Sequence, residues 1–179
     1  MQQRKQNIRW NTMRILVFGF LGVIFIGAVL LWLPISNQQP IAFMDSLFTA
    51  TSAVCVTGLV TITPAAQFTI FGKVILLFLI QIGGLGVIAC AAVFFLILRR
   101  QITVRETYNM DSLGGMVGMV KRVITGTFLV EGAGAFLYAF QFVPEFGLVR
   151  GICYSIFHAV SAFCNAGIDI LGANSFADY

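Results

Sequence analysis

The stretch SLFTATSAVCVTGL, Ser46 to Leu59, reappears 109 positions later as SIFHAVSAFCNAGI, Ser155 to Ile168. Seven of the fourteen aligned positions carry the same residue, and the alignment needs no gap. The identical pairs are Ser46/Ser155, Phe48/Phe157, Ala50/Ala159, Ser52/Ser161, Ala53/Ala162, Cys55/Cys164 and Gly58/Gly167. Two copies at a fixed offset indicate a duplicated structural unit rather than a bias of composition.

The composition predicts that this unit belongs to a membrane protein. Hydrophobic residues make up 59% of the 179 residues and charged residues only 10%. The mean hydropathy is +0.93. Soluble domains are far less apolar and carry more charge. We therefore expect an all-α membrane protein.

Three stretches are apolar and long enough to cross a bilayer, which takes about 20 helical residues. They are residues 15–35, 74–98 and 123–143. A cleaved signal peptide is the competing interpretation of the first stretch, because basic residues precede it. Its apolar run is longer than the 7 to 15 residues of such a core, and no small-residue cleavage pattern follows it. These observations favour a membrane anchor.

The basic residues predict the orientation of the chain. Nine of the eleven lie either before the first span or between the second and third spans. By the positive-inside rule, residues 1–14 are a cytoplasmic N-terminal segment and residues 99–122 a cytoplasmic connection. Both copies of the repeated unit then face the outside. This bias also accounts for the net charge of +4, so we expect no nucleic-acid partner.

The repeated unit has the pattern of a re-entrant loop. From Ser46 to Gly72 the chain carries no charge, is rich in Ser and Thr, and is interrupted by Gly58 and Pro64. A helix from about Phe43 to Cys55 would reach only part-way through a bilayer at 1.5 Å per residue. Residues Val56 to Leu59 would then return as extended chain. Irregular backbone at this depth is tolerated only where it is buried in protein or lines a watery cavity.

Such a loop is suited to binding a cation. The C-terminal end of the short helix carries a partial negative charge, and the glycine lets successive carbonyl oxygens face one axis. A ring of carbonyls can replace the hydration shell of an ion. The predicted ligands are the backbone oxygens of Val56, Thr57, Gly58, Leu59, Asn165, Ala166, Gly167 and Ile168. Interfacial loops that merely descend from a duplication are the alternative, but the Ser-Ala-x-Cys-x-x-Gly frame in both copies favours pore loops.

Four motifs resemble those of one known family. They are FMDSLFTATSAVCVTGL, LIQIGGLGV, VEGAGA and FHAVSAFCNAGIDI. In order and spacing they are similar to the Trk/Ktr/HKT superfamily of potassium transporters, and look closest to the bacterial Ktr-type membrane subunit. The resemblance covers residues 14–169. It implies four consecutive repeats of helix, re-entrant pore helix with filter loop, and second helix, around a pore like that of a potassium channel.

The resemblance also assigns individual residues and partners. It implies that Gly58 and Gly167 are filter glycines, while Ile168 departs from the phenylalanine often found after the second of them. A cytosolic nucleotide-binding regulatory subunit and a homodimer of the membrane subunit are implied as partners, next to K⁺ and the lipid of the plasma membrane.

The predicted function is K⁺ uptake across a bacterial plasma membrane by a multi-pass protein with a cytoplasmic N-terminus. We expect no enzyme activity, because the sequence shows no nucleophile-base pair, phosphate loop or paired carboxylates. We also expect no cofactor and no side-chain site for a transition metal; Na⁺ dependence is left open.

The length of the chain departs from the family pattern. Residues 15–98 would form one complete repeat, and residues 123–179 a second repeat without its second helix, about one and a half of four. We expect a fragment, a truncated gene product or one segment of a split pore. The rival function is a non-transporting remnant or accessory subunit that keeps part of the fold without a pore.

The remaining polar and small residues have structural interpretations that we favour. Glu131 is expected to face the protein interior and pack between helices rather than coordinate an ion. His158 takes the place of Thr49 and is expected to pack on a pore helix rather than bind a metal. Cys55 and Cys164 are expected to be small apolar residues rather than a disulfide. Four small residues are expected to allow close helix packing rather than form a hinge: Gly83, Gly84, Gly86 and Cys90.

Overall fold

The computed structural model describes residues 2–99 and 113–172, and the secondary structure within these ranges is helical. The elements in chain order are α1 (Gln2–Trp32), the 3₁₀ helix η1 (Pro34–Ser36), α2 (Phe43–Cys55), α3 (Pro64–Gln67), α4 (Ile70–Arg99), α5 (Leu113–Phe146) and α6 (Leu148–Phe163). The predicted all-α class is therefore confirmed for the described part of the chain.

Two of the expected segments can be compared with the helix bounds. Helix α1 begins at Gln2 and continues into the first expected span, and the cytoplasmic location of residues 1–14 stays a prediction. The connection 99–122 falls partly on residues 100–112, which lie outside the described residues, and its remainder is already the start of α5. The short helix α2 has the predicted bounds.

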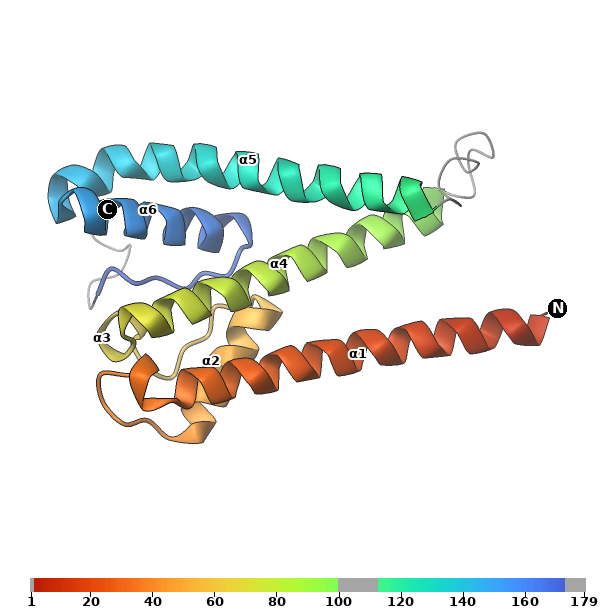
Figure 1. The fold of residues 1–179 in the computed structure, drawn as a ribbon, viewed down its shortest axis with the longest axis horizontal. Helices are drawn as coiled ribbons and strands as arrows, with labels where there is room; N and C mark the ends of the chain where they lie inside the picture. Colours follow the sequence, from red (N-terminus) through yellow and green to blue (C-terminus); the bar gives the residue numbers. More distant parts are fainter. Residues whose placement is uncertain (1, 100–112, 173–179) are drawn as a thin grey trace.

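The helices form two groups that share α4 (Figure 1). Helix α2 packs against both α1 and α4, whereas α6 packs against α5 and also contacts α4. In Figure 1, α1 and α5 run in the same direction, as expected of equivalent helices in two repeats. Because α4 contacts both short helices, it is the element that fixes one group relative to the other.

The connections on either side of α2 are tied together at one end of the first group. The backbone N–H of Thr69 donates to the carbonyl oxygen of Ser36 at 3.0 Å, and that of Gln38 donates to Gln67 at 2.8 Å. The Ser36 hydroxyl in turn donates to the carbonyl of Leu30 at 2.6 Å, near the C-terminal end of α1. These bonds hold the start of α4 beside the end of α1.

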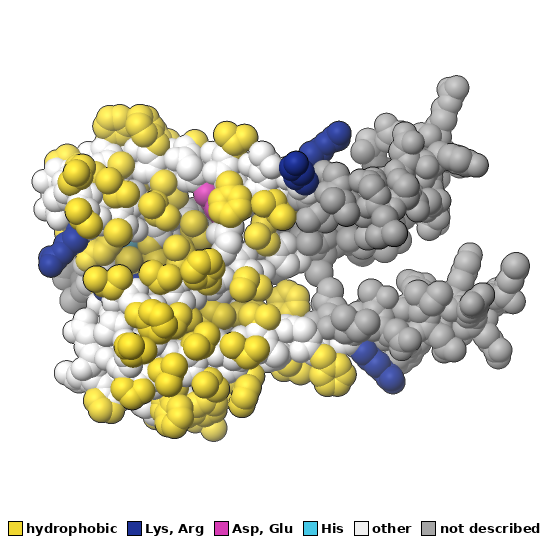
Figure 2. Space-filling model, in the orientation of Figure 1, with side chains coloured by type: hydrophobic (Ala, Val, Ile, Leu, Met, Phe, Trp, Pro, Cys, Tyr) yellow, Lys and Arg dark blue, Asp and Glu magenta, His cyan; other side chains and the backbone are white. Residues whose placement is uncertain are grey.

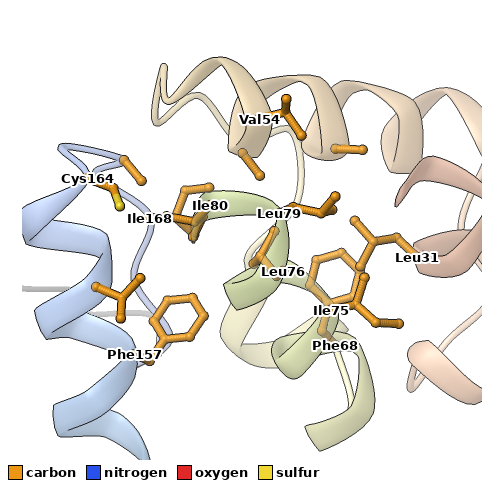
Figure 3. Close-up of a cluster of buried hydrophobic side chains, with 14 of the residues drawn as sticks. Leu31, Val54, Phe68, Ile75, Leu76, Leu79, Ile80, Phe157, Cys164 and Ile168 are labelled. Carbon is orange, nitrogen blue, oxygen red and sulfur yellow. The ribbon is translucent and has the colours of Figure 1, made fainter. Parts of the chain in front are cut away.

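A single cluster of buried apolar side chains spans both groups. Leu31, Val54 and Leu76 come from α1, α2 and α4, and all three are fully buried. Ile168, from the segment after α6, belongs to the same cluster and lies near Ile80 of α4 in Figure 3. Its members line the space between the two short helices and α4.

The outer surface carries large hydrophobic side chains, and Lys and Arg are found near its edges (Figure 2). Phe18, Phe25, Phe128, Phe136 and Phe140 are each more than half exposed. Such a broad apolar surface indicates contact with lipid or with further protein.

The three expected spans lie mainly on α1, α4 and α5. Within the described residues, Lys121–Phe146 of α5 is long and apolar enough to cross a membrane. The apolar parts of α1 and α4 whose side chains are described, Val17–Trp32 and Ile70–Gly86, cover only part of these two helices.

Candidate functional site

The two loops that follow α2 and α6 repeat the same backbone conformation. We call residues 56–61 the first loop and residues 165–170 the second loop. Val56 has φ 57° and Asn165 has φ 58°, and two positions later Gly58 has φ 73° and Gly167 has φ 65°. Each loop therefore places left-handed residues at equivalent positions, 109 residues apart.

The hydrogen bonds that end the two short helices are also equivalent. The N–H of Thr57 donates to the carbonyl of Ser52 at 3.0 Å, and the N–H of Ala166 donates to Ser161 at 2.8 Å. The residues before these two donors, Val56 and Asn165, are left-handed. Each donates its backbone N–H to the carbonyl oxygen three positions earlier, at 3.3 Å for Val56 and 3.0 Å for Asn165. This pair of bonds is the Schellman ending of a helix. In both copies it reverses the chain directly into the loop.

The left-handed conformation of Val56 was not predicted from the sequence, which suggested an extended return from Val56 to Leu59. A β-branched residue is rarely left-handed, so its own identity argued against this geometry. The available signal was Asn165 at the equivalent position, because Asn is enriched in this conformation. The hydrogen bonds that end α2 hold Val56 in the left-handed conformation, and equivalent bonds end α6 in the second copy.

The two loops meet at their glycines. A methyl group added at Gly58 would lie 2.6 Å from the carbonyl oxygen of Ala166 and 3.5 Å from the Cα of Gly167. A methyl group added at Gly167 would lie 3.7 Å from the Cα of Gly58. The fold thus brings together two residues that are far apart in sequence, and it leaves no space for a side chain at Gly58.

Side chains of α6 hold the second loop. The Ser161 hydroxyl donates to the carbonyl oxygen of Ile168 at 2.7 Å. The N–H of Ile170 donates to Nε2 of His158 at 3.4 Å, and Nδ1 of His158 lies 2.7 Å from the carbonyl oxygen of Tyr154. These two bonds fit a neutral imidazole with its proton on Nδ1.

His158 is also packed among aromatic rings. Its ring centroid lies 5.4 Å from that of Phe142 and 5.7 Å from that of Phe157, and the side chain is 2% exposed. This geometry places His158 in the packing role that the sequence favoured.

The first loop is held by different side chains. The Thr57 hydroxyl donates to the Ser52 hydroxyl at 3.0 Å. The Thr61 hydroxyl donates to the Asp45 carboxylate at 3.1 Å, which ties the end of the loop to the start of α2. Equivalent loops are therefore fastened to their helices by unrelated bonds.

Helix α4 touches the ends of both short helices through two adjacent glycines. A methyl group added at Gly83 would overlap the carbonyl oxygen of Val54, and one added at Gly84 would overlap Sγ of Cys164. The expectation that these glycines allow close packing is confirmed. A methyl group at Gly86 would lie 2.7 Å from the ring of Phe20. The side chain of Cys90 lies outside the described residues.

The face of α4 that carries Gly84 also bonds to α5. The side-chain amide of Gln81 donates to the Glu131 carboxylate at 3.0 Å. Glu131 is 5% exposed, so the prediction that it faces the protein interior is confirmed. The bond joins α4, which both groups share, to α5 of the second group.

The eight predicted ligand residues therefore lie in two loops that the fold places side by side. None of the eight has a charged side chain. The loops can offer backbone carbonyl oxygens and the partly negative C-terminal ends of α2 and α6. Such groups attract cations, although the carbonyl of Ile168 is already bonded to Ser161.

Residues 2–179 match the family described as TrkH, cation transport protein. The chain is 40% identical over 169 residues to the Ktr system potassium uptake protein B of Bacillus subtilis, an alignment that covers 91% of this chain and 38% of the relative. It is 38% identical over 178 residues to the potassium/sodium uptake protein NtpJ of Enterococcus hirae, covering 95% of this chain and 40% of the relative.

A further relative is the Ktr system potassium uptake protein B of Vibrio alginolyticus, 39% identical over 160 residues that cover 86% of this chain and 35% of the relative. The chain thus spans about two fifths of the length of these relatives.

Proposed function

Since this chain belongs to the TrkH family of cation transport proteins, we propose that it forms part of a pathway for K⁺ uptake across a bacterial plasma membrane. The family is one of transporters and not of enzymes. The observation that carries the proposal is the meeting of two loops with the same left-handed geometry at Gly58 and Gly167. Two relatives are named potassium uptake proteins, which supports K⁺ as the ion.

In the proposed mechanism, α2 and α6 are pore helices of re-entrant loops, and each loop lines part of a selectivity filter. The ion gives up water for backbone carbonyls of residues 56–59 and 165–168, as in other carbonyl filters. The oxygen of Ile168 is the weakest of these ligands, because the Ser161 hydroxyl already occupies one of its lone pairs. Two loops supply part of the ring, and further loops complete it.

Sodium is a second candidate for a transported or coupled ion. One relative, at 38% identity, is named a potassium/sodium uptake protein. A cytosolic nucleotide-binding subunit and a second copy of the membrane subunit are proposed as partners on the family resemblance. The rival proposal remains a non-transporting membrane subunit that keeps this fold.

An uptake assay separates these proposals. We would replace the matching segment of the Bacillus subtilis relative by this chain and express the chimera in a bacterium deficient in K⁺ uptake. The expected result is growth at low K⁺ and ⁸⁶Rb⁺ uptake, with Na⁺ added or withheld to test coupling; the unaltered relative is the positive control. A chimera that reaches the membrane in normal amount but transports neither ion would favour the non-transporting subunit.

The proposed orientation places both loops on the outer side, and labelling tests this in the same chimera. After the native cysteines are replaced, single cysteines at Gln39 and Arg150 should react with an impermeant thiol reagent in intact cells, and one at Lys121 should react only after the cells are opened. All three side chains are exposed in the structure, so burial does not mask the result. Labelling of Lys121 and Gln39 from the same side would contradict the orientation.

A further inference from the structure

We infer that Gly84 is a positioning residue for the second loop, and that its contact with Cys164 sets how closely the two loops lie. The inference rests on the proposed function, because it concerns the spacing of the proposed filter. It assigns α4 the role of a spacer between the two loops, in addition to being the second helix of its own repeat.

The first step is the contact itself. A methyl group added at Gly84 would overlap Sγ of Cys164 and lie 2.7 Å from its Cβ and 3.4 Å from its Cα. Cys164 is the last residue before the left-handed Asn165, and it is buried. Any displacement of Cys164 therefore passes directly into the second loop.

The second step is that α4 also contacts α2 just before the first loop begins. A methyl group at the neighbouring Gly83 would lie 2.8 Å from the carbonyl carbon of Val54 and 2.9 Å from its Cα. Val54 stands two residues before Val56, where the first loop begins. Adjacent glycines of one helix thus touch the chain just before each loop, so α4 determines the distance between them.

The third step is that the second loop cannot move away freely. On its other side the loop meets Gly58, which lies close to the carbonyl oxygen of Ala166. Helix α5, which packs on α6, is joined to α4 by the Gln81–Glu131 hydrogen bond. Gln81 and Gly84 are three residues apart on one face of α4. The hydrogen bond of Gln81 and the contact of Gly84 therefore both hold α4 against the group of helices formed by α5 and α6. A shift at Cys164 must therefore change how Gly58 and Ala166 meet.

Another glycine of α4, Gly86, provides a matched comparison. A methyl group at Gly86 would meet the end of the Phe20 ring at 2.7 Å, and this ring belongs to α1. The Phe20 ring can move away by rotation about its side-chain bonds, whereas Cβ and Cα of Cys164 move only when the backbone moves. The same substitution at Gly84 and Gly86 therefore separates a general packing effect from an effect on the second loop.

The experiment uses the chimera described above and measures uptake of K⁺ and Na⁺ over a range of concentrations. Gly84→Ala should lower the ratio of K⁺ to Na⁺ uptake by about tenfold and raise the half-saturation concentration for K⁺, with an unchanged amount of protein in the membrane. Gly86→Ala should leave both quantities unchanged. Adding Cys164→Gly to Gly84→Ala should restore most of the ratio, because it removes the Sγ and Cβ atoms that the new methyl group meets. Cys164 has a right-handed backbone (φ −73°, ψ −7°), which glycine can adopt at a cost of about 1 kcal/mol or less.

A second variant tests the contact from the opposite side. Cys164→Val crowds Gly84 without changing α4 and should also lower the ratio of K⁺ to Na⁺. Loss of total uptake in Gly84→Ala with an unchanged ratio and half-saturation, or equal effects of Gly84→Ala and Gly86→Ala, would overturn the inference. So would failure of Cys164→Gly to improve Gly84→Ala in either quantity. Absence of uptake by the unmutated chimera would instead contradict the proposed function, so the two failures are distinguishable.

Discussion

The first and second loops have the same backbone geometry but different means of support. Both begin with a left-handed residue, Val56 or Asn165, and carry a left-handed glycine two positions later. The end of the first loop is tied to Asp45 through a side chain, whereas the end of the second is tied to His158 through the backbone of Ile170. The comparison teaches that the conserved feature of the duplicated unit is the path of the backbone, and that unrelated side-chain bonds can maintain it.

The loops also differ in how tightly their glycines are enclosed. Gly58 faces the Ala166 carbonyl oxygen, so it needs glycine for space as well as for its φ angle. Gly167 meets the described residues only at ordinary contact distance, 3.7 Å from the Cα of Gly58. The two equivalent glycines are therefore constrained differently: Gly58 by both space and φ angle, and Gly167 by its φ angle.

The largest expected effect comes from replacing these glycines by serine in the chimera. Gly58→Ser and Gly167→Ser share the cost of a left-handed side chain, about 1 to 2 kcal/mol, which is roughly a tenfold effect. Gly58→Ser also pushes against the Ala166 carbonyl, so it should reduce K⁺ affinity and K⁺ over Na⁺ selectivity more than Gly167→Ser does. Uptake kinetics measure both quantities.

The control for this pair is Gly132→Ser on α5. Gly132 is exposed, and a methyl group there meets no described atom within 4 Å. Uptake by this variant should equal that of the parent. Unchanged kinetics in both filter variants would remove the filter assignment, and a larger effect at Gly167 would reverse the comparison.

A smaller effect is expected when α6 is given the residue at the equivalent position of α2, His158→Thr. Thr49 bonds back to the carbonyl of Asp45 at 2.8 Å, so threonine can replace the bond of His158 to Tyr154. It cannot reach Ile170, whose buried N–H would lose its partner at a cost of about 1 to 3 kcal/mol. The midpoint of thermal unfolding in detergent should fall by several degrees.

Thr49→Ser is the matched control, because it keeps the hydroxyl at the equivalent position of α2. Its unfolding midpoint should stay close to that of the parent. If His158→Thr unfolds at the same temperature as the parent, the bond to Ile170 does not support the second loop.

The smallest effect is expected from the serines that the two copies share. Ser161→Ala frees the Ile168 carbonyl from a buried hydrogen bond, worth about 1 kcal/mol, and should change the half-saturation concentration for K⁺ by a few-fold. Ser52→Ala removes only a contact between two hydroxyls and should have less effect, because Thr57 is exposed and its hydroxyl can bond to water. Equal responses of the two variants in an uptake assay would show that the support of the loops does not differ at this position.

Several features of the fold could be predicted because the chemistry that causes them is local. The uncharged Ser- and Thr-rich stretch ended by a glycine predicted the helix Phe43–Cys55, whose bounds the structure reproduces. The cost of a charge in an apolar helix predicted that Glu131 faces inward, and it is buried against Gln81. The length of α5 could not be read from the apolar run alone, because Lys121 and Arg122 interrupt the hydrophobic pattern while the helix continues through them.

The sequence by itself determined that a unit is duplicated, that it is apolar and helical, and that each copy carries a glycine at the same place. Only the tertiary structure decided that Gly58 and Gly167 lie close together, that Val56 is left-handed, and that Gly83 and Gly84 contact the ends of different short helices. The physical reason is the range of the interactions involved. Periodicity and helix ends depend on neighbours along the chain, whereas the meeting of two loops depends on how α4 packs against both short helices, and no local pattern encodes that packing.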